Sequence, residues 1–521
     1  MTHLRKTKTN VSLFFITAYL LFVVLPAASG CDKSPKGTIS VSVIDFQQTP
    51  VQEANITVTS RLLSLEIKKT TSSEGKCVFP SLPPGSDYVV TFEKEGFITK
   101  TRKNVTVTDK KDKALREMLR VDIKKIPGRW RIARNRSKTG KLSSKQKEAM
   151  RKLETLSYLS GHKTAPKAKN VTIYNKKKAF KGLNLYCSGH GPEAILTDMN
   201  GKQLHRWRYH ITGIWEKKYN PLSPHHLFWR RVHLMENGDL LAIFEGHGLI
   251  KIDKNSRLLW DYPGNAHHDL FVMPEGKIYV LTRKAVLDTR YNETEPILKD
   301  FIVILSPRGK EIRRVSVLKC LENSTYAPVL EKMKKTGDIL HTNTIEVLKG
   351  RLAHRSPAFK KGNVLISILY LDLIAVVDME KESVVWAMSG MWKRQHQPTV
   401  LDNGNMLIFD NQFGSDPVVS RVLEFDPFTG KIRWEYRGSK DSPFYTGDCG
   451  SCQRLPNGNT LISETNSGRA FEVAPDKTIV WEFFNPKRAG KDRELIASLF
   501  ELIRIEPGYF AEPLFYRSPG N

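Results

Sequence analysis

Acidic residues are scarce in this sequence. Its 521 residues include 54 Asp and Glu against 82 Lys and Arg, which gives a formal net charge of +28. Such an imbalance influences solubility and the choice of partner, not the fold. Gly and Pro show no excess, which excludes collagen-like and low-complexity chains, and 40% hydrophobic residues exclude global disorder. At roughly 100–200 residues per domain, the length predicts two or three domains.

Long apolar runs are also lacking. Beyond residue 30 no stretch approaches the roughly 20 apolar residues that a membrane-spanning helix needs. Residues 1–30 combine a basic start, a shorter apolar run at 11–25 and small residues at 27–30, the three parts of a secretory signal peptide. We therefore expect export, with a retained signal anchor as the alternative. Cys31 follows as in a bacterial lipobox, so the protein is expected to be periplasmic or membrane-anchored through a lipidated Cys31, with ordinary cleavage as the alternative to lipidation.

Cysteine is rare, with six residues. Cys449 and Cys452 have the C-x-x-C spacing, but the sequence lacks the βαβ context of a redox motif and the second ligand pair of a zinc site. A local disulfide or two buried thiols are therefore expected here.

Residues 37–120 are predicted to form a β-sandwich. Short runs at 39–43, 54–59 and 88–92 alternate with period two and are separated by Gly- and Pro-rich turns. The order of these strands and turns resembles the carboxypeptidase regulatory-like domain, of transthyretin-like topology. The resemblance implies a spacer or adhesion module without a catalytic group.

A basic linker at residues 121–169 follows. From residue 120 to 169 there are sixteen Lys and Arg and three acidic residues, an excess of +13 obtained as sixteen minus three. Ser143 or Ser144 is predicted to cap a short helix. The charge predicts attraction to an anionic membrane surface or an acidic or sulfated polysaccharide. No specific nucleic-acid partner is expected, since no base-reading motif is present. The alternative is a solvated spacer or a helix that packs on the next domain.

The region after residue 170 repeats one phrase, a strand followed by an Asn-Gly or Glu-Gly turn and another strand. An Asn-Gly pair between alternating runs is the strongest short-range hairpin signal. Each copy continues with a strand that carries an acidic residue and a strand that, in most copies, ends in Trp. The copies begin near residues 194 (partial), 233, 268, 362, 401 and 455.

Four short strands in a unit of roughly 40–50 residues are typical of a β-propeller blade. Six copies predict a six-bladed β-propeller at residues 170–487, followed by a C-terminal tail at 488–521. With the N-terminal β-sandwich and the short helical basic linker, the chain is expected to be all-β. The Trp residues are expected to pack at the blade edges rather than to hold a cofactor.

In a propeller the innermost strand of each blade lines the central channel, so chemistry should collect at its start. Counting back eight residues from the turn Gly of three copies gives Arg230, His268 and His396, and His341 begins the equivalent phrase of a fourth copy. Residues of four blades that share a register are expected to converge. Three histidines can hold zinc, but no carboxylate partners are evident for them, and the Arg-rich neighbours favour an anion. No metal site is therefore predicted.

The phrases around these histidines, at residues 267–269, 341–344 and 395–411, resemble the bacterial arylsulfotransferase family. The resemblance implies a six-bladed propeller that moves a sulfuryl group from an aryl sulfate to a phenol through a sulfohistidine, without a diffusible cofactor. It also implies site roles. His396 matches the nucleophile, and His268, His341 and Asn343 match the groups around the sulfate oxygens.

One position departs from the family pattern. The family has Ser-x-Arg on the fourth blade, where the Arg holds the sulfate, whereas this chain reads Ser367-Ile368-Leu369. Leu369 lies seven residues after the turn glycine of its copy, Gly362. On the adjacent blade, Arg283 lies seven residues after Gly276 and so occupies the equivalent position. Either Arg283 holds the sulfate, beside Arg230, or the site has lost sulfotransfer.

Two other functions stay open. Leu369 and the net charge favour a non-catalytic propeller that binds a sulfated or anionic ligand such as a polysaccharide. A metallohydrolase built on the histidine cluster is the third possibility. The sequence names neither the donor nor the acceptor, and it leaves the oligomeric state open.

Overall fold

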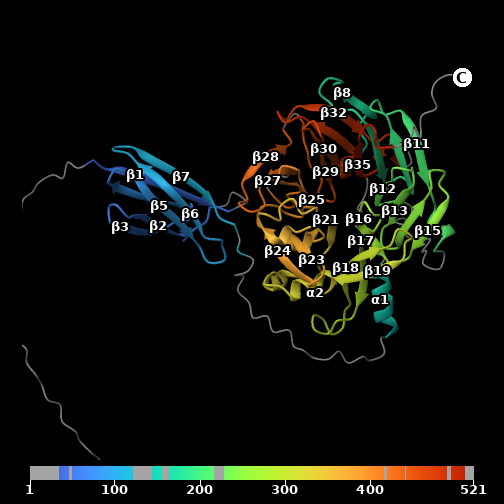
Figure 1. Ribbon diagram of the computed structural model, residues 1–521, viewed down its shortest axis with the longest axis horizontal. Helices are drawn as coiled ribbons and strands as arrows, with labels where there is room; N and C mark the ends of the chain where they lie inside the picture. Colours follow the sequence, from blue (N-terminus) through green and yellow to red (C-terminus); the bar gives the residue numbers. More distant parts are fainter. Residues whose placement is uncertain are drawn as a thin grey trace, which may run out of the picture.

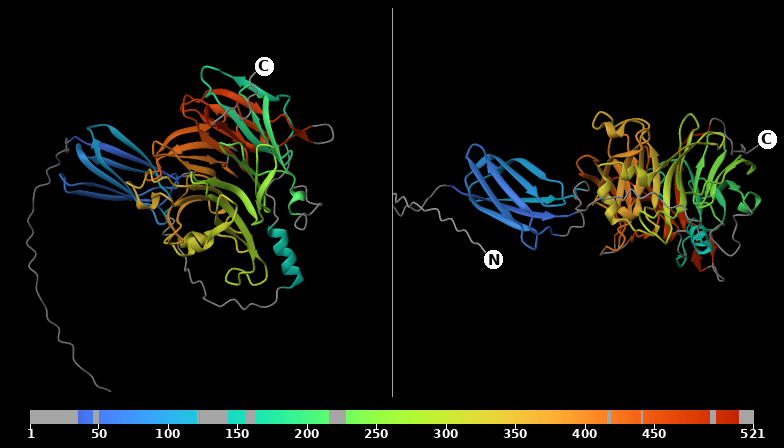
Figure 2. Two further views of the ribbon diagram at one scale, coloured as in Figure 1. Left: turned by 45° about the vertical axis from the view of Figure 1, so that its right-hand side comes forward. Right: turned by 90° about the horizontal axis from the view of Figure 1, so that it is seen from below.

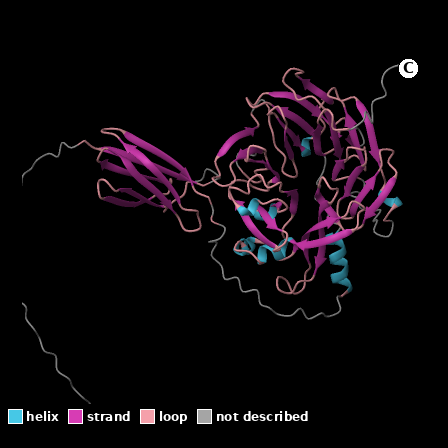
Figure 3. Ribbon diagram, viewed as in Figure 1, coloured by secondary structure: helices cyan, strands magenta, loops and turns pink. Residues whose placement is uncertain are grey.

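The computed structural model describes residues 35–45, 50–120, 122, 143–154, 163–215, 228–415, 419–439, 442–489 and 494–510. The predicted signal peptide, Cys31 and most of the basic linker lie outside these ranges. None of the helices in the described ranges is long and apolar enough to cross a membrane. The described chain forms a small N-terminal body beside a larger ring of sheets (Figure 1). Strands dominate both, which confirms the predicted all-β class (Figure 3).

The N-terminal body is a sandwich of two sheets. The first has the order β4-β1-β7 and the second β3-β2-β5-β6. Alternate residues of β1, such as Ile39 and Val41, are buried and pack with Val58 and Val90 of the facing sheet, as the period-two pattern predicts. The strands are β1 (Gly37–Ile44), β2 (Asn55–Ser60), β3 (Leu65–Thr70), β4 (Lys76–Leu82), β5 (Gly85–Glu93), β6 (Lys100–Val107) and β7 (Asp112–Met118).

Between residues 163 and 510 the described chain holds six further sheets of four or five strands, numbered here in chain order. The first contains β9 (Leu183–Ser188), β10 (Glu193–Thr197), β11 (Gln203–Arg208) and β35 (Leu499–Ile505), and the second β12 (Arg231–Leu234), β13 (Leu240–Phe244), β14 (Gly248–Ile252) and β15 (Leu258–Tyr262). The third contains β16 (Ala266–Val272), β17 (Ile278–Val286), β18 (Ile297–Leu305) and β19 (Glu311–Ser316), with the short β20 (Gly337–Asp338) beside β18.

The fourth sheet contains β21 (Thr342–Val347), β22 (Val364–Ile368), β23 (Leu373–Asp378) and β24 (Ser383–Ser389), and the fifth β25 (His396–Val400), β26 (Met406–Asp410), β27 (Arg421–Phe425) and β28 (Ile432–Arg437). The sixth contains β29 (Ser451–Arg454), β30 (Thr460–Glu464), β31 (Arg469–Val473), β32 (Ile479–Phe484) and β8 (Asn170–Tyr174). Contacts run from β12 through β16, β21, β25 and β29 to β35, and β9 beside β35 contacts β12, so the six sheets close a propeller ring.

Both ends of the propeller contribute to its closure. The C-terminal strand β35 is the innermost strand of the first sheet, and the N-terminal strand β8 is the outermost strand of the sixth. The repeats predicted that the propeller ends at residue 487. The structure shows that it extends to Ile505. The repeats miss β35 because it is a single strand without a hairpin turn of its own, and its partner β9 lies some 300 residues earlier in the chain.

The tryptophans connect neighbouring sheets. The buried Trp207 donates from Nε1 to the carbonyl of Gly238, in the hairpin turn of the next sheet, at 3.0 Å. Trp481 of the sixth sheet donates in the same way to Met199 of the first sheet at 2.9 Å. A buried indole N–H needs such a partner. These contacts support the packing role that was predicted for the tryptophans.

One part of the basic linker packs on the propeller. Helix α1 (Ser144–Glu154) is capped by Ser143, whose Oγ accepts from the Gln146 N–H at 3.1 Å while Gln146 Oε1 accepts from the Ser143 N–H at 3.0 Å. The helix contacts β17 and β18. The sandwich lies against the rim of the ring (Figure 2), where Lys100 Nζ donates to the carbonyl of Thr429 at 3.5 Å.

Candidate active site

Three inner strands, β16, β21 and β25, share an irregularity at their first residues. In each, the antiparallel register shifts next to the histidine singled out in the sequence: His268, His341 and His396. His268 and His341 have φ of +53° and +56°, the left-handed region that residues with a Cβ rarely adopt. Such bulges re-aim side chains and are frequent next to active sites. Local geometry therefore turns these histidines out of the strand pattern.

His268 and His341 meet directly. Their ring centroids are 4.7 Å apart, at an interplanar angle of 71°. The rings are almost fully buried, with 3% and 7% of each residue exposed. His267 lies behind His268, with the two Nδ1 atoms 2.9 Å apart, and its Nε2 is 3.7 Å from Asp300 Oδ1. Of the two adjacent histidines, it is thus His268 that faces the histidine of the neighbouring sheet.

The hydrogen bonds of His396 define its tautomer. Its Nδ1 lies 2.8 Å from Oδ1 of Asn411 and 3.1 Å from the carbonyl of Arg394, and both of these atoms are acceptors. The amide of Asn411 cannot turn around, because its Nδ2 donates to the carbonyls of Thr446 and Cys449 at 2.9 and 2.6 Å. Nδ1 of His396 must therefore carry the proton, which leaves Nε2 with a free lone pair.

His268 and His396 are neutral at ordinary pH. Burial, followed by the charges of Arg230 and His341, lowers the pKa of His396 to about 3, although the Asn411 hydrogen bond opposes this. Burial, followed by the charge of His341 and then of Arg230, also lowers the pKa of His268 well below its usual range. A neutral imidazole with a free Nε2 can act as a nucleophile, which a protonated one cannot.

Two arginines and one glutamate surround the cluster. Glu245, at the end of β13, lies 3.9 Å from Nε of Arg230, 3.6 Å from Nη1 of Arg283 and 3.5 Å from Nδ1 of His268. The charge of Arg230 lowers the pKa of both His268 and His396, whereas that of Arg283 lowers the pKa of His267 and His268. The structure therefore puts Arg230 in electrostatic contact with the predicted nucleophile and Arg283 behind the neighbouring histidines.

The fourth sheet supplies His341 and Asn343. Nδ1 of His341 is 2.6 Å from Oδ2 of Asp338, a pairing that fixes the orientation of this imidazole. Asn343 is buried and donates from Nδ2 to the carbonyl of Gln395 at 2.9 Å, which ties it to the segment that precedes His396. These contacts join the fourth and fifth sheets at the candidate site.

Leu369 brings no charge to this site. It begins a short 3₁₀ turn, Leu369–Leu371, directly after β22, and its N–H donates to the carbonyl of His341 at 3.1 Å. The side chain is buried, with 6% of the residue exposed. The position is therefore next to the histidines, as the family pattern implies, but its side chain is apolar.

A metal ion has one set of ligands available in the described residues. Side-chain atoms of Glu245, His267 and His268 all lie within 4.8 Å of one another. Arg230 and Arg283 compete with any cation for the same carboxylate. Asp300 and Asp338 lie next to the same histidine cluster, beside His267 and His341, so the two arginines face three carboxylates in all.

The C-x-x-C pair is not a disulfide. Cys449 and Cys452 are buried free thiols, one of the two outcomes that the sequence predicted. Burial raises the pKa of both thiols, to about 12 for Cys452. Sγ of Cys449 accepts from Nη2 of Arg230 at 3.3 Å, so this thiol belongs to the wall of the site.

Sequence reasoning missed Glu245, Asp338 and the role of Asn411. The first and last had a signal: both lie seven residues after the turn Gly of their own copy, at Gly238 and Gly404, the register that also gave Arg283. Asp338 had none, because it lies in the insertion that precedes the fourth sheet.

Comparison with protein families supports this architecture. Residues 231–486 match the family model of the arylsulfotransferases (ASST), and residues 38–119 match the carboxypeptidase regulatory-like domain. No protein of curated function matches the chain.

Three solved structures illustrate the likeness in fold. A protein of unknown function from Bacteroides caccae is 11% identical over 62% of this chain and 98% of its own, with a TM-score of 0.41. The WD40 β-propeller domain of Doa1 is 12% identical over 68% and 100%, and that of Cps50 (Swd1) from Myceliophteria thermophila 11% over 66% and 99%, each with a TM-score of 0.36. All three scores lie below 0.5, so the description of the site depends on this chain's own geometry.

Proposed function

We propose that this chain, which carries an arylsulfotransferase (ASST) domain at residues 231–486 and a carboxypeptidase regulatory-like domain at 38–119, transfers a sulfuryl group from an aryl sulfate to a phenol. The observation that carries the proposal is the neutral His396, whose Nδ1 is held by Asn411 so that Nε2 keeps its lone pair. In the first step this nitrogen attacks sulfur and forms an N–S bond. The bond from sulfur to the aryl oxygen breaks, and its electron pair leaves with that oxygen.

The sulfuryl oxygens need fixed donors. Arg230 acts on His396 through its charge, Asn343 donates to the carbonyl of the residue before His396, and His268 lies against His341, so donors from three sheets surround this part of the channel. Donors that are already oriented stabilise charge as it develops, and they act more strongly in a buried site than in water. Arg230 thereby takes the part that the family assigns to the arginine absent from position 369.

His341 handles the proton. With Asp338 accepting from Nδ1, the imidazolium form of His341 passes its Nε2 proton to the departing aryl oxygen and becomes neutral. In the second step a phenol replaces the released one. Its oxygen attacks sulfur, its proton passes to Nε2 of His341, and the N–S bond breaks to return the lone pair to His396. The balance closes without a diffusible cofactor.

Turnover tests the proposal. Wild-type protein, given 4-nitrophenyl sulfate and phenol, should release nitrophenol and form phenyl sulfate. His396→Ala should lose this activity while its melting temperature changes little, because the ring fills no part of the apolar core. Full turnover by a folded His396→Ala variant would exclude this histidine as the nucleophile.

Leu369 favours a second candidate function, a propeller that binds a sulfated or anionic ligand without transferring it. The buried apolar side chain stands where the family has its sulfate-binding arginine. If the site only binds, wild type releases no nitrophenol, and Leu369→Arg restores some release. If Arg230 has taken over the sulfate, wild type is active, Arg230→Gln loses about 100-fold or more in kcat/KM, and Leu369→Arg adds nothing.

A further inference from the structure

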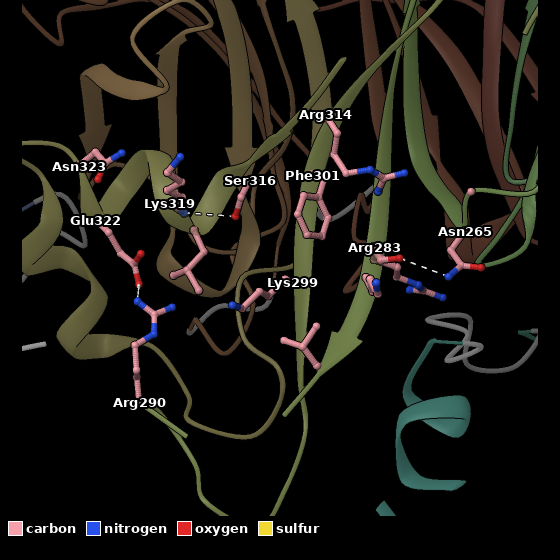
Figure 4. Close-up of a pocket in the computed structure, with 14 residues that line it drawn as sticks. Asn265, Arg283, Arg290, Lys299, Phe301, Arg314, Ser316, Lys319, Glu322 and Asn323 are labelled. Carbon is pink, nitrogen blue, oxygen red and sulfur yellow. Dashed lines mark hydrogen bonds and ion pairs between the residues drawn. The ribbon is translucent and has the colours of Figure 1, made fainter. Parts of the chain in front are cut away.

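A groove of about 880 Å³ lies beside the third sheet (Figure 4). It exists because β17 and β18 are nine residues long, whereas their counterparts β13 and β14 in the second sheet have five. The long hairpin projects past the ring at the end where the histidines begin their strands. Its volume is in the range of sites that hold one small molecule.

Strand register places the groove's key side chains on one face of the third sheet. Lys284 of β17 pairs with Lys299 of β18, and Phe301, two residues further on, pairs with Ser316 of β19. Side chains at alternate positions and in paired positions share a face. Arg314 lies on the same face, with its guanidinium 5.3 Å from the centre of the Phe301 ring. Figure 4 shows the Phe301 ring between Lys299 and Arg314.

The groove is basic, and its charges can be counted. Six cations line it together with one acidic residue, Glu322: Arg283, Lys284, Arg290, Lys299, Arg314 and Lys319. Carboxylates hold five of these cations: Glu245 pairs with Arg283, Asp288 with Arg290 and Lys299, Glu322 with Arg290, Glu311 with Arg314, and Glu382 with Lys319. Among the residues that the structure describes, no carboxylate pairs with Lys284. Six cations against five carboxylates leave one positive charge.

The groove and the candidate active site share a wall. Asn265, three residues before His268, lines the groove. Its carbonyl accepts from the Arg283 N–H at 3.2 Å, and its Nδ2 donates to the Arg283 carbonyl at 3.4 Å. Arg283 in turn lies 3.6 Å from Glu245, the carboxylate next to His268. These contacts connect the groove to His268 through two side chains, Arg283 and Glu245.

We propose that this groove is a binding site for an aromatic molecule with a single anionic group, separate from the histidine site. One uncompensated charge matches one anion, and a partly buried ring flanked by cations matches an aromatic face. That the natural ligand is an aryl sulfate rests on the proposed function. The groove then holds a second aryl sulfate next to the site that consumes the first.

Calorimetric titration of the full chain with 4-nitrophenyl sulfate tests the proposal, in the His396→Ala background so that no ligand is consumed. Phe301→Leu keeps most of the apolar volume, and Lys284→Gln removes the unpaired charge. Each should weaken one class of binding site by about tenfold or more and leave any other class unchanged. Inorganic sulfate and phenol, each offering half of the ligand, should bind this class at least tenfold more weakly.

The matched control is Arg308→Gln with Lys310→Gln. Both residues are exposed in the β18–β19 turn, at the opposite end of the same sheet, so the pair changes the net charge without touching the groove. Unchanged titrations for Phe301→Leu and Lys284→Gln, equal losses in the control, or equal affinity for inorganic sulfate would each overturn the proposal. A failed turnover assay with intact groove binding would instead count against the transferase alone.

Discussion

The nucleophile proposed here depends on a residue that does not need to touch the substrate. Asn411 holds the Nδ1 proton of His396 and is itself fixed by two carbonyls. Asn411→Ala frees the imidazole to rotate and to exchange tautomers, so we expect kcat to fall by about 10- to 100-fold, the usual effect of losing such a partner, with little change in KM. Steady-state kinetics with an aryl sulfate provides the measurement.

Asn405→Ala is the matched control for that variant. Asn405 lies in the turn at the other end of the same β25–β26 hairpin, where its amide donates to Glu424 at 2.7 Å. Its loss should leave kcat unchanged. Equal loss of kcat in the two variants would mean that Asn411 acts only by stabilising the hairpin.

The buried neutral state of His396 also predicts a pH dependence of stability. The pKa of His396 is about 3 in the folded chain, whereas a histidine pKa of about 6.5 applies in the unfolded chain. The unfolded state therefore binds more protons below pH 6.5, and acidification destabilises the fold through this residue. From about pH 7.5 to 5.5, the unfolding free energy of wild type should fall by about 1.4 kcal/mol more than that of His396→Gln. Parallel pH profiles in urea unfolding would contradict the burial of a neutral ring.

At the scale of elements, the closure of the propeller ring depends on a single strand. β35 supplies the inner strand of the first sheet from the far end of the chain. Phe500 in this strand is 2% exposed and packs its ring 5.0 Å from that of Phe228. Phe500→Ala should cost about 3–5 kcal/mol of unfolding free energy through the cavity it leaves. The exposed Leu259 is the control, and Leu259→Ala should change stability by less than about 0.5 kcal/mol.

Equal stability of the two variants in thermal or urea unfolding would show that β35 is dispensable for the ring. A loss confined to Phe500→Ala would show that the last strand holds the first sheet in place.

The hairpin repeats predicted most of the propeller because each turn needs its own local chemistry. Gly238, Gly404 and Gly458 all have positive φ, which glycine adopts readily. The Asn-Gly turns can therefore be recognised from the sequence. Counting from the turn glycines led to Arg230, His268 and His396, and the equivalent phrase of the fourth sheet led to His341, whose ring contacts that of His268. β35 and Asp338 were not predictable in this way, since their positions depend on pairings between distant segments and leave no periodic signal.

At the scale of the whole molecule, the basic linker is expected to govern association with anionic surfaces. Its helix α1 already packs on β17 and β18, and residues 164–165 pair with the segment near β34 (Leu495–Ile496), so these parts act as structure. We propose that the rest of the linker attracts the anionic membrane surface. We also propose that the protein is exported and held at the membrane through Cys31. Replacing Arg129, Arg131, Arg134 and Arg136 by Gln should weaken binding to phosphatidylglycerol vesicles at low salt and have little effect at high salt, where charges are screened.

A vesicle-sedimentation assay measures this difference. Four Gln replacements at Lys254, Arg308, Lys310 and Lys431 of the propeller change the net charge equally and serve as the control. Equal binding by both variants would assign the attraction to net charge and not to the linker.

The central claim is that His396 carries the sulfuryl group between donor and acceptor. The most direct measurement is mass spectrometry of the peptide that contains His396, after rapid mixing of wild-type protein with an aryl sulfate in the absence of a phenol. The account predicts one sulfuryl group on this histidine, which disappears when phenol is added and is never formed by His396→Ala. Transfer to phenol by the wild type with no modified His396, or with the group on another residue, would contradict it.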